Sequence, residues 1–392
     1  MDENTMTAAD IRITESPSRF REGLLIETHG FRHERMLDGE AVSSLLVADY
    51  RMRIGIADVS MGGIVSVGTK EGHRNRGYSR QVIQNSIAWM EAHSYDCSIL
   101  FGIDNFYHKF GYAVCLPECR IEVKTRDAET APPALTVRPF AAADAPSLHA
   151  LYAGNNGALT GSFVRGPDYH WFRKGSGYFV RPEAVVFTDA AGDIVAYAAR
   201  DLSADHVTVC EMGARQPEHC AVILRWAAGL AIERRLETVA FLAPPDSVFA
   251  EAVSAYGARQ TITLPRNGSG GGQILGMGRL VRLRPFFERT LPEWTRRAAT
   301  ARSLSRGASA RLETDIGALT LRWSGDAVEI DAEAPAAGCV RLPQWRLMQL
   351  AMGYHSAEVA LSFPEVQGSG ALDLFHALFQ RRPGYLYKTD QF

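Results

Sequence analysis

Residues 64–79 read as an apolar strand, a short polar loop and the start of a helix, in that order. The strand ends at Val67, and the loop carries Arg74, Arg76 and Gly77 before the helix begins. A helix N-terminus presents free N–H groups and the positive end of the helix dipole, and a glycine lets a ligand approach the backbone. The two arginines add cationic donors suited to phosphate. The segment therefore predicts an anion site, with a pyrophosphate as the expected ligand.

The spacing within the loop narrows the kind of pyrophosphate. The segment contains neither the dinucleotide-binding pattern G-x-G-x-x-G nor the P-loop pattern G-x-x-x-x-G-K-[ST]. Instead, Arg74-x-x-Gly77-x-Ser79 resembles the acetyl-coenzyme A loop of the GNAT acetyltransferases, [QR]-x-x-G-x-[GA]. Ser79 departs from the last position of that pattern but still supplies a small side chain. By itself, the hexad is also compatible with an arginine-rich helix start that binds nothing.

A second motif follows at the distance that the resemblance implies. Apolar residues at helical spacing predict an amphipathic helix over residues 79–93, and a buried strand is expected at residues 97–101. The segment from Asp104 to Tyr112 then resembles the second GNAT signature, N-x-x-Y-x-x-x-G-[FY]. In that family, the tyrosine that matches Tyr107 protonates the departing thiolate of coenzyme A. Without the upstream loop, the favoured interpretation of Tyr107 is an aromatic residue packed under a turn.

Composition and charge favour an intracellular enzyme of several domains. The chain has 392 residues and 46% hydrophobic content, enough for two or three cores of ordinary domain size. A formal net charge of −2 provides no field that would recruit nucleic acid or an anionic membrane. The acidic N-terminus lacks the apolar segment of a signal peptide, and no apolar run approaches the roughly 18 residues of a membrane helix. We therefore expect a cytoplasmic protein without a nucleic-acid or membrane partner.

The six cysteines show neither a C-x-x-C pair nor the spacing of zinc ligands. Single buried thiols in a reducing compartment are the expected state. The sequence thus predicts neither a disulfide framework nor a metal site.

A second unit with a similar order of predicted strands and helices follows the first 130 residues. Pro132-Pro133 lies between the two units, and we interpret it as a linker. In the first unit, strands are expected at residues 11–14, 43–50, 52–59 and 63–67, and a helical segment near residues 17–27. In the second, strands are expected at residues 135–139, 184–187, 194–197 and 207–210, with helices at 148–152 and 218–233.

The second unit lacks the chemistry of the first at the loop position. Residues 215–220 contain no glycine, Pro217 removes an amide donor, and Glu218 would repel phosphate. We interpret residues 131–278 as a degenerate repeat that kept the fold and lost the cofactor. The glycine-rich stretch Asn267–Gly272 has no following Lys-Ser/Thr, so we expect a flexible loop between strands there.

Residues 279–392 have a different pattern that loosely resembles a sterol-carrier-protein-like domain. The expected elements are helices at residues 285–297, 342–352 and 371–381 and strands at 311–313, 319–323 and 327–330.

Two GNAT-like repeats followed by a sterol-carrier-like domain resemble the enhanced-intracellular-survival (Eis) family of bacterial N-acetyltransferases over essentially the whole chain. The resemblance implies an α+β fold with mixed sheets. It divides the chain into a catalytic GNAT domain (residues 1–130), a degenerate GNAT-like domain (131–278) and a sterol-carrier-protein-like domain (279–392).

The same resemblance implies roles for individual residues. Val67 and Thr69 would contact the pantetheine arm through their backbone, and the loop at Arg74 would surround the pyrophosphate. The cofactor-binding residues expected on this basis are Val67, Gly68, Thr69, Arg74, Asn75, Arg76, Gly77, Tyr78, Ser79 and Asn105.

The resemblance also makes the C-terminal carboxylate, here that of Phe392, a base. An α-carboxyl group has an ordinary pKa of roughly 3.3–3.7, so at neutral pH it is an ionised acceptor and a weak base. It is better suited to hold the substrate ammonium, or to relay its proton through water, than to abstract that proton directly. The alternative is that the end of the chain is frayed and inert.

These observations predict an acetyl-coenzyme A-dependent N-acetyltransferase acting on a primary amine, with Tyr107 as general acid, Phe392 as base or amine anchor, and no metal. Aminoglycosides, polyamines, lysine side chains and other small amines remain open as acceptors. The family implies a homo-oligomer, with a hexamer as its common assembly. Two alternatives remain: a non-catalytic lipid- or ligand-binding protein with a decayed GNAT domain, and an acyltransferase with a longer acyl donor.

Overall fold

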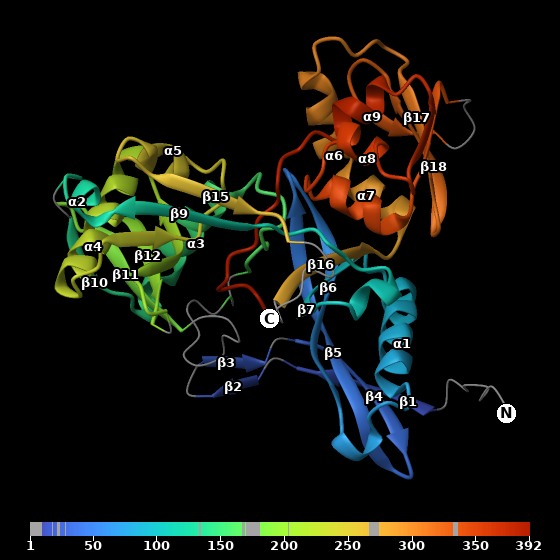
Figure 1. Cartoon of the computed structure of the whole chain (residues 1–392), viewed down its shortest axis with the longest axis horizontal. Helices are drawn as coiled ribbons and strands as arrows, with labels where there is room; N and C mark the ends of the chain where they lie inside the picture. Colours follow the sequence, from blue (N-terminus) through green and yellow to red (C-terminus); the bar gives the residue numbers. More distant parts are fainter. Residues whose placement is uncertain are drawn as a thin grey trace. The chain divides into compact units, whose positions relative to one another are not determined.

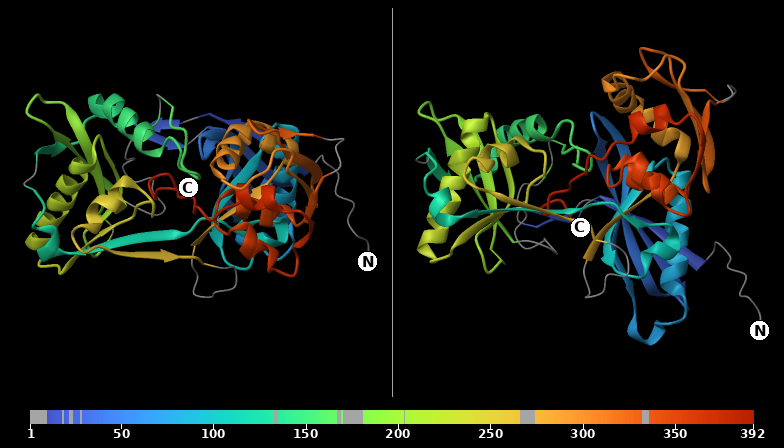
Figure 2. Two further views of the ribbon diagram at one scale, coloured as in Figure 1. Left: turned by 90° about the horizontal axis from the view of Figure 1, so that it is seen from above. Right: turned by 45° about the horizontal axis from the view of Figure 1, so that its top comes forward.

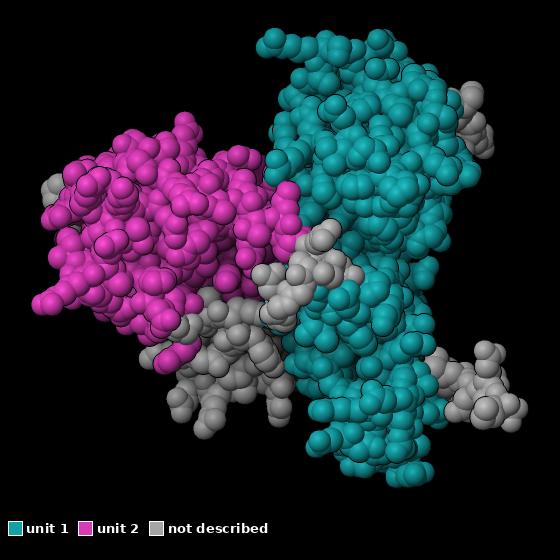
Figure 3. Space-filling model, in the orientation of Figure 1, with its two compact units in different colours: residues 1–115, 266–382 teal, residues 116–265, 383–392 magenta. Residues whose placement is uncertain are grey.

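The computed structural model describes residues 10–17, 19–21, 24–27, 29–132, 135–166, 169, 181–202, 204–265, 274–331 and 336–392. The chain divides into two compact units, which Figure 3 distinguishes by colour. Unit 1 comprises residues 1–115 and 266–382, and unit 2 comprises residues 116–265 and 383–392. Each unit is described separately below.

Unit 1 contains a seven-stranded sheet that carries the predicted cofactor loop. Its order is β1 (Ile11–Ser16), β4 (Gly30–Leu37), β5 (Glu40–Ile54), β6 (Ala57–Thr69), β7 (Cys97–Ile103), β16 (Ile274–Leu280) and β8 (Ala113–Val114). Only β6 and β7 are parallel, and helix α1 (Tyr78–Ala92) connects them beside the sheet (Figure 1). Val82, Ile83 and Met90 bury one face of α1, as its apolar spacing predicts.

Two local predictions for this unit are wrong. The segment near residues 17–27 forms no single helix, because β2 (Arg19–Arg21) and β3 (Leu24–Glu27) pair as antiparallel strands. The apolar spacing of so short a segment suits a hairpin as well as one face of a helix. The predicted break near residue 51 is absent as well. Strand β5 continues to Ile54, and the turn falls at Gly55, which has φ +59°.

Unit 2 repeats this architecture. Its sheet has the order β10 (Thr136–Pro139), β11 (Pro182–Thr188), β12 (Ile194–Asp201), β13 (Thr208–Ala214), β14 (Thr238–Phe241), β9 (Glu118–Lys124) and β15 (Arg259–Thr263). Again only one neighbouring pair, β13 and β14, is parallel, and helix α4 (Pro217–Glu233) connects it. Helices α2 (Thr125–Ala128), α3 (Ala145–Asn156) and α5 (Val248–Ser254) complete the repeat. The predicted α+β class with tandem copies of one fold is confirmed.

Each of the two sheets contains one strand that the order of the sequence does not predict. Strand β9 precedes the second repeat in the chain, but it pairs with β14 and β15 in unit 2. Both views of Figure 2 show β9 and β15 side by side as a long teal and yellow ribbon. Strand β16 follows the second repeat, but it pairs with β7 and β8 in unit 1. Domain boundaries near residues 130 and 278 remain a prediction.

The rest of unit 1 is a five-stranded sheet with helices. The sheet has the order β19 (Val328–Ile330), β18 (Gly317–Trp323), β17 (Ser309–Thr314), β20 (Gly338–Arg341) and β21 (Gln367–Gly370). The helices are α6 (Leu283–Thr300), α7 (Gln344–Ala351), α8 (Ala357–Leu361) and α9 (Asp373–Leu378). Buried Glu293 of α6 accepts a hydrogen bond from the N–H of Ile56, which ties this helix to the β5–β6 turn.

Other expectations concern particular residue types. All six cysteines are free, five of them buried, as predicted. Within the described ranges, no helix is long and apolar enough to cross a membrane. The expected glycine-rich loop Asn267–Gly272 lies outside the described residues.

Candidate functional site

The parallel strands β6 and β7 pair over only part of their length. Their ladder joins Met61–Ile64 to Cys97–Leu100, after which β6 continues to Thr69 and β7 to Ile103 without pairing to each other. Beyond the ladder, β6 has an irregularity in its register against β5, and Ser66 there has φ +53°. The predicted residues Val67, Gly68 and Thr69 therefore occupy the stretch of β6 that has left its parallel neighbour.

The predicted loop connects this diverging strand to the N-terminus of α1. Arg74, Asn75, Arg76 and Gly77 are exposed, whereas Tyr78 and Ser79 are the first two residues of the helix. Gly77 is the N-cap residue with φ +79°, and no side chain caps the helix. An added Cβ at Gly77 would meet open space, so its backbone conformation, not crowding, favours glycine. The helix end thus keeps donors for an anion.

The loop contributes two exposed arginines. Within the described part of the chain, neither Arg74 nor Arg76 forms an ion pair. Their neighbour Lys70, in contrast, pairs with Glu40. Two exposed guanidinium groups beside an uncapped helix N-terminus suit a phosphate-bearing ligand.

Tyr107 packs on strand β7 at the point where β7 has left β6. It is the first residue of the short helix η3 (Tyr107–Phe110) and is 8% exposed. A Cβ added to Gly102 would lie 2.2 Å from Cε2 of Tyr107, so the absence of a side chain at Gly102 is what admits the ring. Phe106 contacts the Tyr107 ring edge to face, at a centroid distance of 5.0 Å. The loop at the end of β6 and the ring of Tyr107 thus both belong to the diverging ends of the same two strands.

The hydroxyl of Tyr107 is available for chemistry. Within the described residues it has no hydrogen-bond partner, and burial raises the pKa of this tyrosine above its ordinary value. Tyr107 is therefore protonated at neutral pH and can donate a proton. Tyr112, in contrast, donates to Ser98 Oγ at 2.8 Å, so its hydroxyl serves the packing of the core.

The turn around Asn105 shapes the approach to Tyr107. Asn105 is exposed with φ +59°, and its N–H donates to the Asp104 carboxylate at 2.8 Å. Asp104, three positions before Tyr107, stands where the GNAT pattern has Asn. The role of Asn105 in cofactor binding remains a prediction.

The far end of η3 is fixed by residues distant in sequence. Gln344 of α7 donates to the carbonyl of Gly111 at 2.7 Å, and its own side-chain carbonyl accepts from the N–H of Leu280 at 2.8 Å. Arg279 Nη1 donates to the carbonyl of Phe110 at 2.5 Å. Gln344 is 1% exposed, and its bond from the N–H of Leu280 is fully buried. The C-terminal part of unit 1 therefore supports the segment that carries Tyr107.

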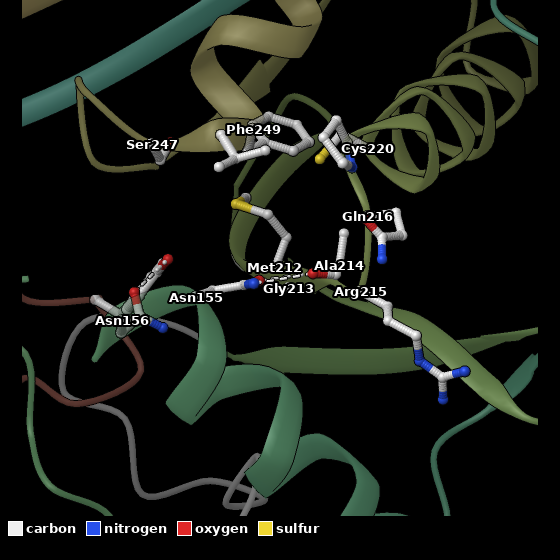
Figure 4. A pocket seen from close by; sticks show the side chains of 13 residues that line it. Asn155, Asn156, Met212, Gly213, Ala214, Arg215, Gln216, Cys220, Ser247 and Phe249 are labelled. Atoms are coloured by element: carbon white, nitrogen blue, oxygen red, sulfur yellow. Dashed lines mark hydrogen bonds between the residues drawn. The ribbon is translucent and has the colours of Figure 1, made fainter. Parts of the chain in front are cut away.

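The second repeat has a pocket at the matching place, shown in Figure 4. Strands β13 and β14 pair only through Thr208–Val209, and a pocket of about 140 Å³ lies where β13 continues towards α4 without β14 beside it. The Asn155 amide bonds both backbone groups of Ala214, donating to its carbonyl at 2.9 Å and accepting from its N–H at 2.8 Å. The Arg215 side chain extends away from the pocket in Figure 4 and donates to the carbonyl of Ile194. In the second repeat, the Asn155 side chain therefore occupies the backbone N–H and carbonyl of Ala214 at the end of β13.

The last ten residues of the chain pack into unit 2. The N–H of Tyr385 donates to the carbonyl of Thr160 at 2.8 Å, and the side chains of Tyr385 and Tyr387 are buried in the core of the second repeat. Phe392 is half-buried, and its ring lies nearly parallel to that of Phe163 at a centroid distance of 6.2 Å. Phe392 therefore belongs to unit 2, whereas the other predicted site residues belong to unit 1.

Sequence reasoning missed several residues of potential functional weight. Asn155 and Gln344 carry no local motif, because each acts on a segment distant in sequence. Gly102 carries none either, because its contact with Tyr107 depends on the turn that follows β7. Glu211 did offer a signal, since a carboxylate inside the apolar strand β13 needs a buried partner. The described residues contain no group of three or more His, Cys, Asp or Glu side chains placed to hold a metal ion.

Comparisons with known proteins bear on the first domain and on the fold. Residues 14–115 match the family model of the acetyltransferase (GNAT) domain. No curated protein matches the sequence. A probable N-acyltransferase from Enterococcus faecalis has 16% identity and a TM-score of 0.70, with 93% of this chain and 89% of that chain covered.

Two further solved structures share the fold across both repeats and the C-terminal part. A GCN5-related N-acetyltransferase from Kribbella flavida has 18% identity and a TM-score of 0.65, covering 92% of this chain and 87% of that one. Eis1 from Mycobacterium abscessus has 16% identity and a TM-score of 0.63, with 92% and 90% covered. The chain is therefore an acyltransferase with a GNAT acetyltransferase domain at residues 14–115 and the fold of the Eis-like GNAT proteins.

Proposed function

We propose that this protein transfers an acetyl group from acetyl-coenzyme A to a primary amine. The observation that carries the proposal is the combination at the diverging ends of β6 and β7. Among the described residues, an uncapped helix N-terminus with two arginines outside any ion pair follows β6, and a buried tyrosine whose hydroxyl has no hydrogen-bond partner packs on β7. The first group suits the pyrophosphate of the cofactor, and the second suits the sulfur of its thioester.

Each step of the transfer reaction gives one of these groups a role. The neutral amine attacks the thioester carbonyl, and N–H groups at the end of β6 are candidates to stabilise the oxyanion. The C–S bond then breaks, and the thiolate takes the proton of the Tyr107 hydroxyl. The carboxylate of Phe392 holds the ammonium of the incoming substrate or accepts its proton through water. Holding both substrates in place supplies part of the acceleration.

Only the first repeat is proposed to bind the cofactor. In the second repeat, Pro217 occupies the first helical position, and Asn155 already bonds the backbone of Ala214. A pantetheine amide would therefore have to displace an internal hydrogen-bonded pair. A protein of this kind that works on a small amine needs neither a metal nor a covalent intermediate. The C-terminal part of unit 1 keeps its proposed likeness to a sterol-carrier-like domain, and a cytoplasmic homo-oligomer, with a hexamer as the family's assembly, remains the expected form.

A screen of amine acceptors tests the proposal. Aminoglycosides, polyamines and lysine-containing peptides would each be incubated with acetyl-coenzyme A, and the release of free thiol would be followed. We expect thiol release with at least one amine and its loss in Tyr107→Phe, with acetyl-coenzyme A binding retained in calorimetry. Absence of coenzyme A binding together with copurified lipid would favour the alternative, a non-catalytic lipid-binding protein with a decayed GNAT domain.

The proposed role of the chain end has its own test. A variant with two residues added after Phe392 should lose most of its activity while keeping its melting temperature and its affinity for acetyl-coenzyme A. Unchanged turnover in this extended protein would refute the role of the terminal carboxylate and leave the remainder of the proposal intact.

A further inference from the structure

Three buried charged residues of unit 2 form a cluster at the end of the chain. Arg165 Nη1 and Nη2 donate to the two carboxylate oxygens of Glu211 at 2.6 and 2.9 Å. Arg165 Nη2 also donates to Oδ2 of Asp390 at 2.8 Å. The side chains of Arg165 and Asp390 are fully shielded from water, and that of Glu211 is 1% exposed. We call these three residues the Arg165 cluster.

Aromatic and hydroxyl groups complete the surroundings of the cluster. The guanidinium carbon of Arg165 lies 3.7 Å from the ring centroid of Tyr152 and 4.3 Å from that of Tyr169. Tyr169 donates its hydroxyl proton to Oδ1 of Asp390 at 2.6 Å, and Tyr197 donates to Oε1 of Glu211 at 3.0 Å. A planar guanidinium between two rings, with a bidentate carboxylate partner, allows little freedom of position.

The cluster connects three separate segments of unit 2. Arg165 comes from the segment after α3, Glu211 from strand β13, and Asp390 from the last ten residues of the chain. The segment of Arg165 also contributes Phe163, whose ring faces Phe392. The hydroxyl of Thr389 donates to Glu211 as well, so two neighbouring tail residues contact the cluster.

Burying these charges is not needed merely to stabilise the tail against unit 2. Apolar side chains of similar volume hold a segment in place as well as a buried ion pair, or better. What the charges add is a single allowed geometry, because a displaced Asp390 would leave a charged group buried without its partner. Phe392 is two residues beyond Asp390, so a fixed Asp390 confines the end of the chain to within about 7 Å.

We propose that the Arg165 cluster fixes the position of the C-terminal carboxylate, and that Arg165, Glu211 and Asp390 are positioning residues for it. This inference rests on the proposed function only for the use of that carboxylate in the reaction. The fixing itself is a property of unit 2 and can be measured without any substrate.

The direct test is digestion of the full-length protein with a carboxypeptidase, with the loss of Phe392 followed by mass spectrometry. Asp390→Ala removes the tail's contact with the cluster and should accelerate release at least about tenfold, equivalent to about 1.4 kcal/mol of lost protection. Asp390→Asn keeps an acceptor for Tyr169 and should restore part of the protection. Asp205→Ala, at an exposed carboxylate of the same unit, should release Phe392 at the wild-type rate.

Kinetics of the same variants connect the tail to the reaction. We expect Asp390→Ala to lower kcat about tenfold, with the affinity for acetyl-coenzyme A unchanged, since that site belongs to unit 1. Asp390→Asn should recover activity in step with its protection. Equal release rates in wild type, Asp390→Ala and Asp205→Ala would overturn the proposal.

A different outcome identifies a failure of the proposed function instead. If Asp390→Ala releases Phe392 faster but keeps its kcat, the cluster fixes the tail and the terminal carboxylate has no part in catalysis. The product lacking Phe392 supplies the matching control, because it removes the carboxylate from its place without altering the cluster. Full activity of that product would point to the same failure. Loss of its activity, together with faster release of Phe392 from Asp390→Ala, would support both proposals.

Discussion

The substitution Gly102→Ala probes the placement of Tyr107 from the strand beneath it. A Cβ at Gly102 would lie 2.2 Å from Cε2 and 2.6 Å from Cδ2 of Tyr107. Carbon atoms in contact prefer separations of about 3.5–4.0 Å, so the ring would have to retreat by about 1.5 Å. A catalytic group misplaced by ~1 Å loses about 100-fold in rate. We therefore expect kcat to fall about 100-fold, which corresponds to about 2.7 kcal/mol of barrier.

Thiol release with a saturating amine measures kcat, and calorimetry measures the affinity for acetyl-coenzyme A. The affinity should change less than about twofold, since the nearest atoms to a Cβ at Gly102 belong to Tyr107 and Leu100. Gly229→Ala is the matched control, because its Cβ would meet no atom within 4 Å. The effect should also depend on the tyrosine, so Gly102→Ala should add less than about threefold in a Tyr107→Phe background. A wild-type kcat for Gly102→Ala, or a full 100-fold loss in the Tyr107→Phe background, would refute the reasoning.

Three further predictions concern the loop, its support and the pH dependence of stability. Gly77→Glu places a carboxylate at the helix N-terminus and strains its φ of +79°, so calorimetry should detect no binding of acetyl-coenzyme A; retained binding would contradict an anion site there. Gln344→Leu leaves two backbone groups without their partner, the buried N–H of Leu280 and the half-buried carbonyl of Gly111, and urea unfolding should show a loss of about 2 kcal/mol together with a lower kcat; equal stability and kcat would contradict the support of η3 by α7. Burial lowers the pKa of His33 to about 4, so the stability that its neutral form contributes is present above pH 6.5 and lost as the pH falls towards 4. Between pH 7 and pH 5 the free energy of unfolding of the wild type should fall by about 2 kcal/mol through His33. His33→Gln lacks the titrating group, so its free energy of unfolding should not show this loss over the same pH range. Identical pH profiles for both proteins would contradict the prediction.

Much of the proposed site lies in one continuous piece of sequence, so its residues could be proposed from the sequence alone. The strand, the loop and the helix of residues 64–79 are adjacent in the chain, and their hydrophobic pattern and glycine define the local backbone. Strand β7 and the turn before Tyr107 follow within one crossover connection. Because a parallel β–α–β unit has one hand, these segments have few alternative arrangements.

Other predictions failed or were missing where local pattern carries little information. The segment at residues 17–27 is too short for its apolar spacing to distinguish a helix from the strands β2 and β3. Strands β9 and β16 carry ordinary strand patterns, and nothing in those patterns says which sheet each one joins. Their pairing partners lie more than a hundred residues away in the sequence, so the local steric preferences of each strand cannot select them.

The sequence alone determined the α+β class and the repeated unit, and it predicted an anion site at residues 64–79, because periodicity, glycine and charge act within a few residues. Only the tertiary structure decided which strand completes each sheet, that Gly102 admits the ring of Tyr107, and that Gln344 supports its loop. It also decided that Arg165 and Glu211 receive Asp390, near the end of the chain, in a buried cluster. The physical reason is that a buried polar residue is defined by the group it meets, and for Gln344 and Arg165 that group comes from a distant segment. The ring that meets Gly102 is near in sequence, but only the folded turn places it over the strand.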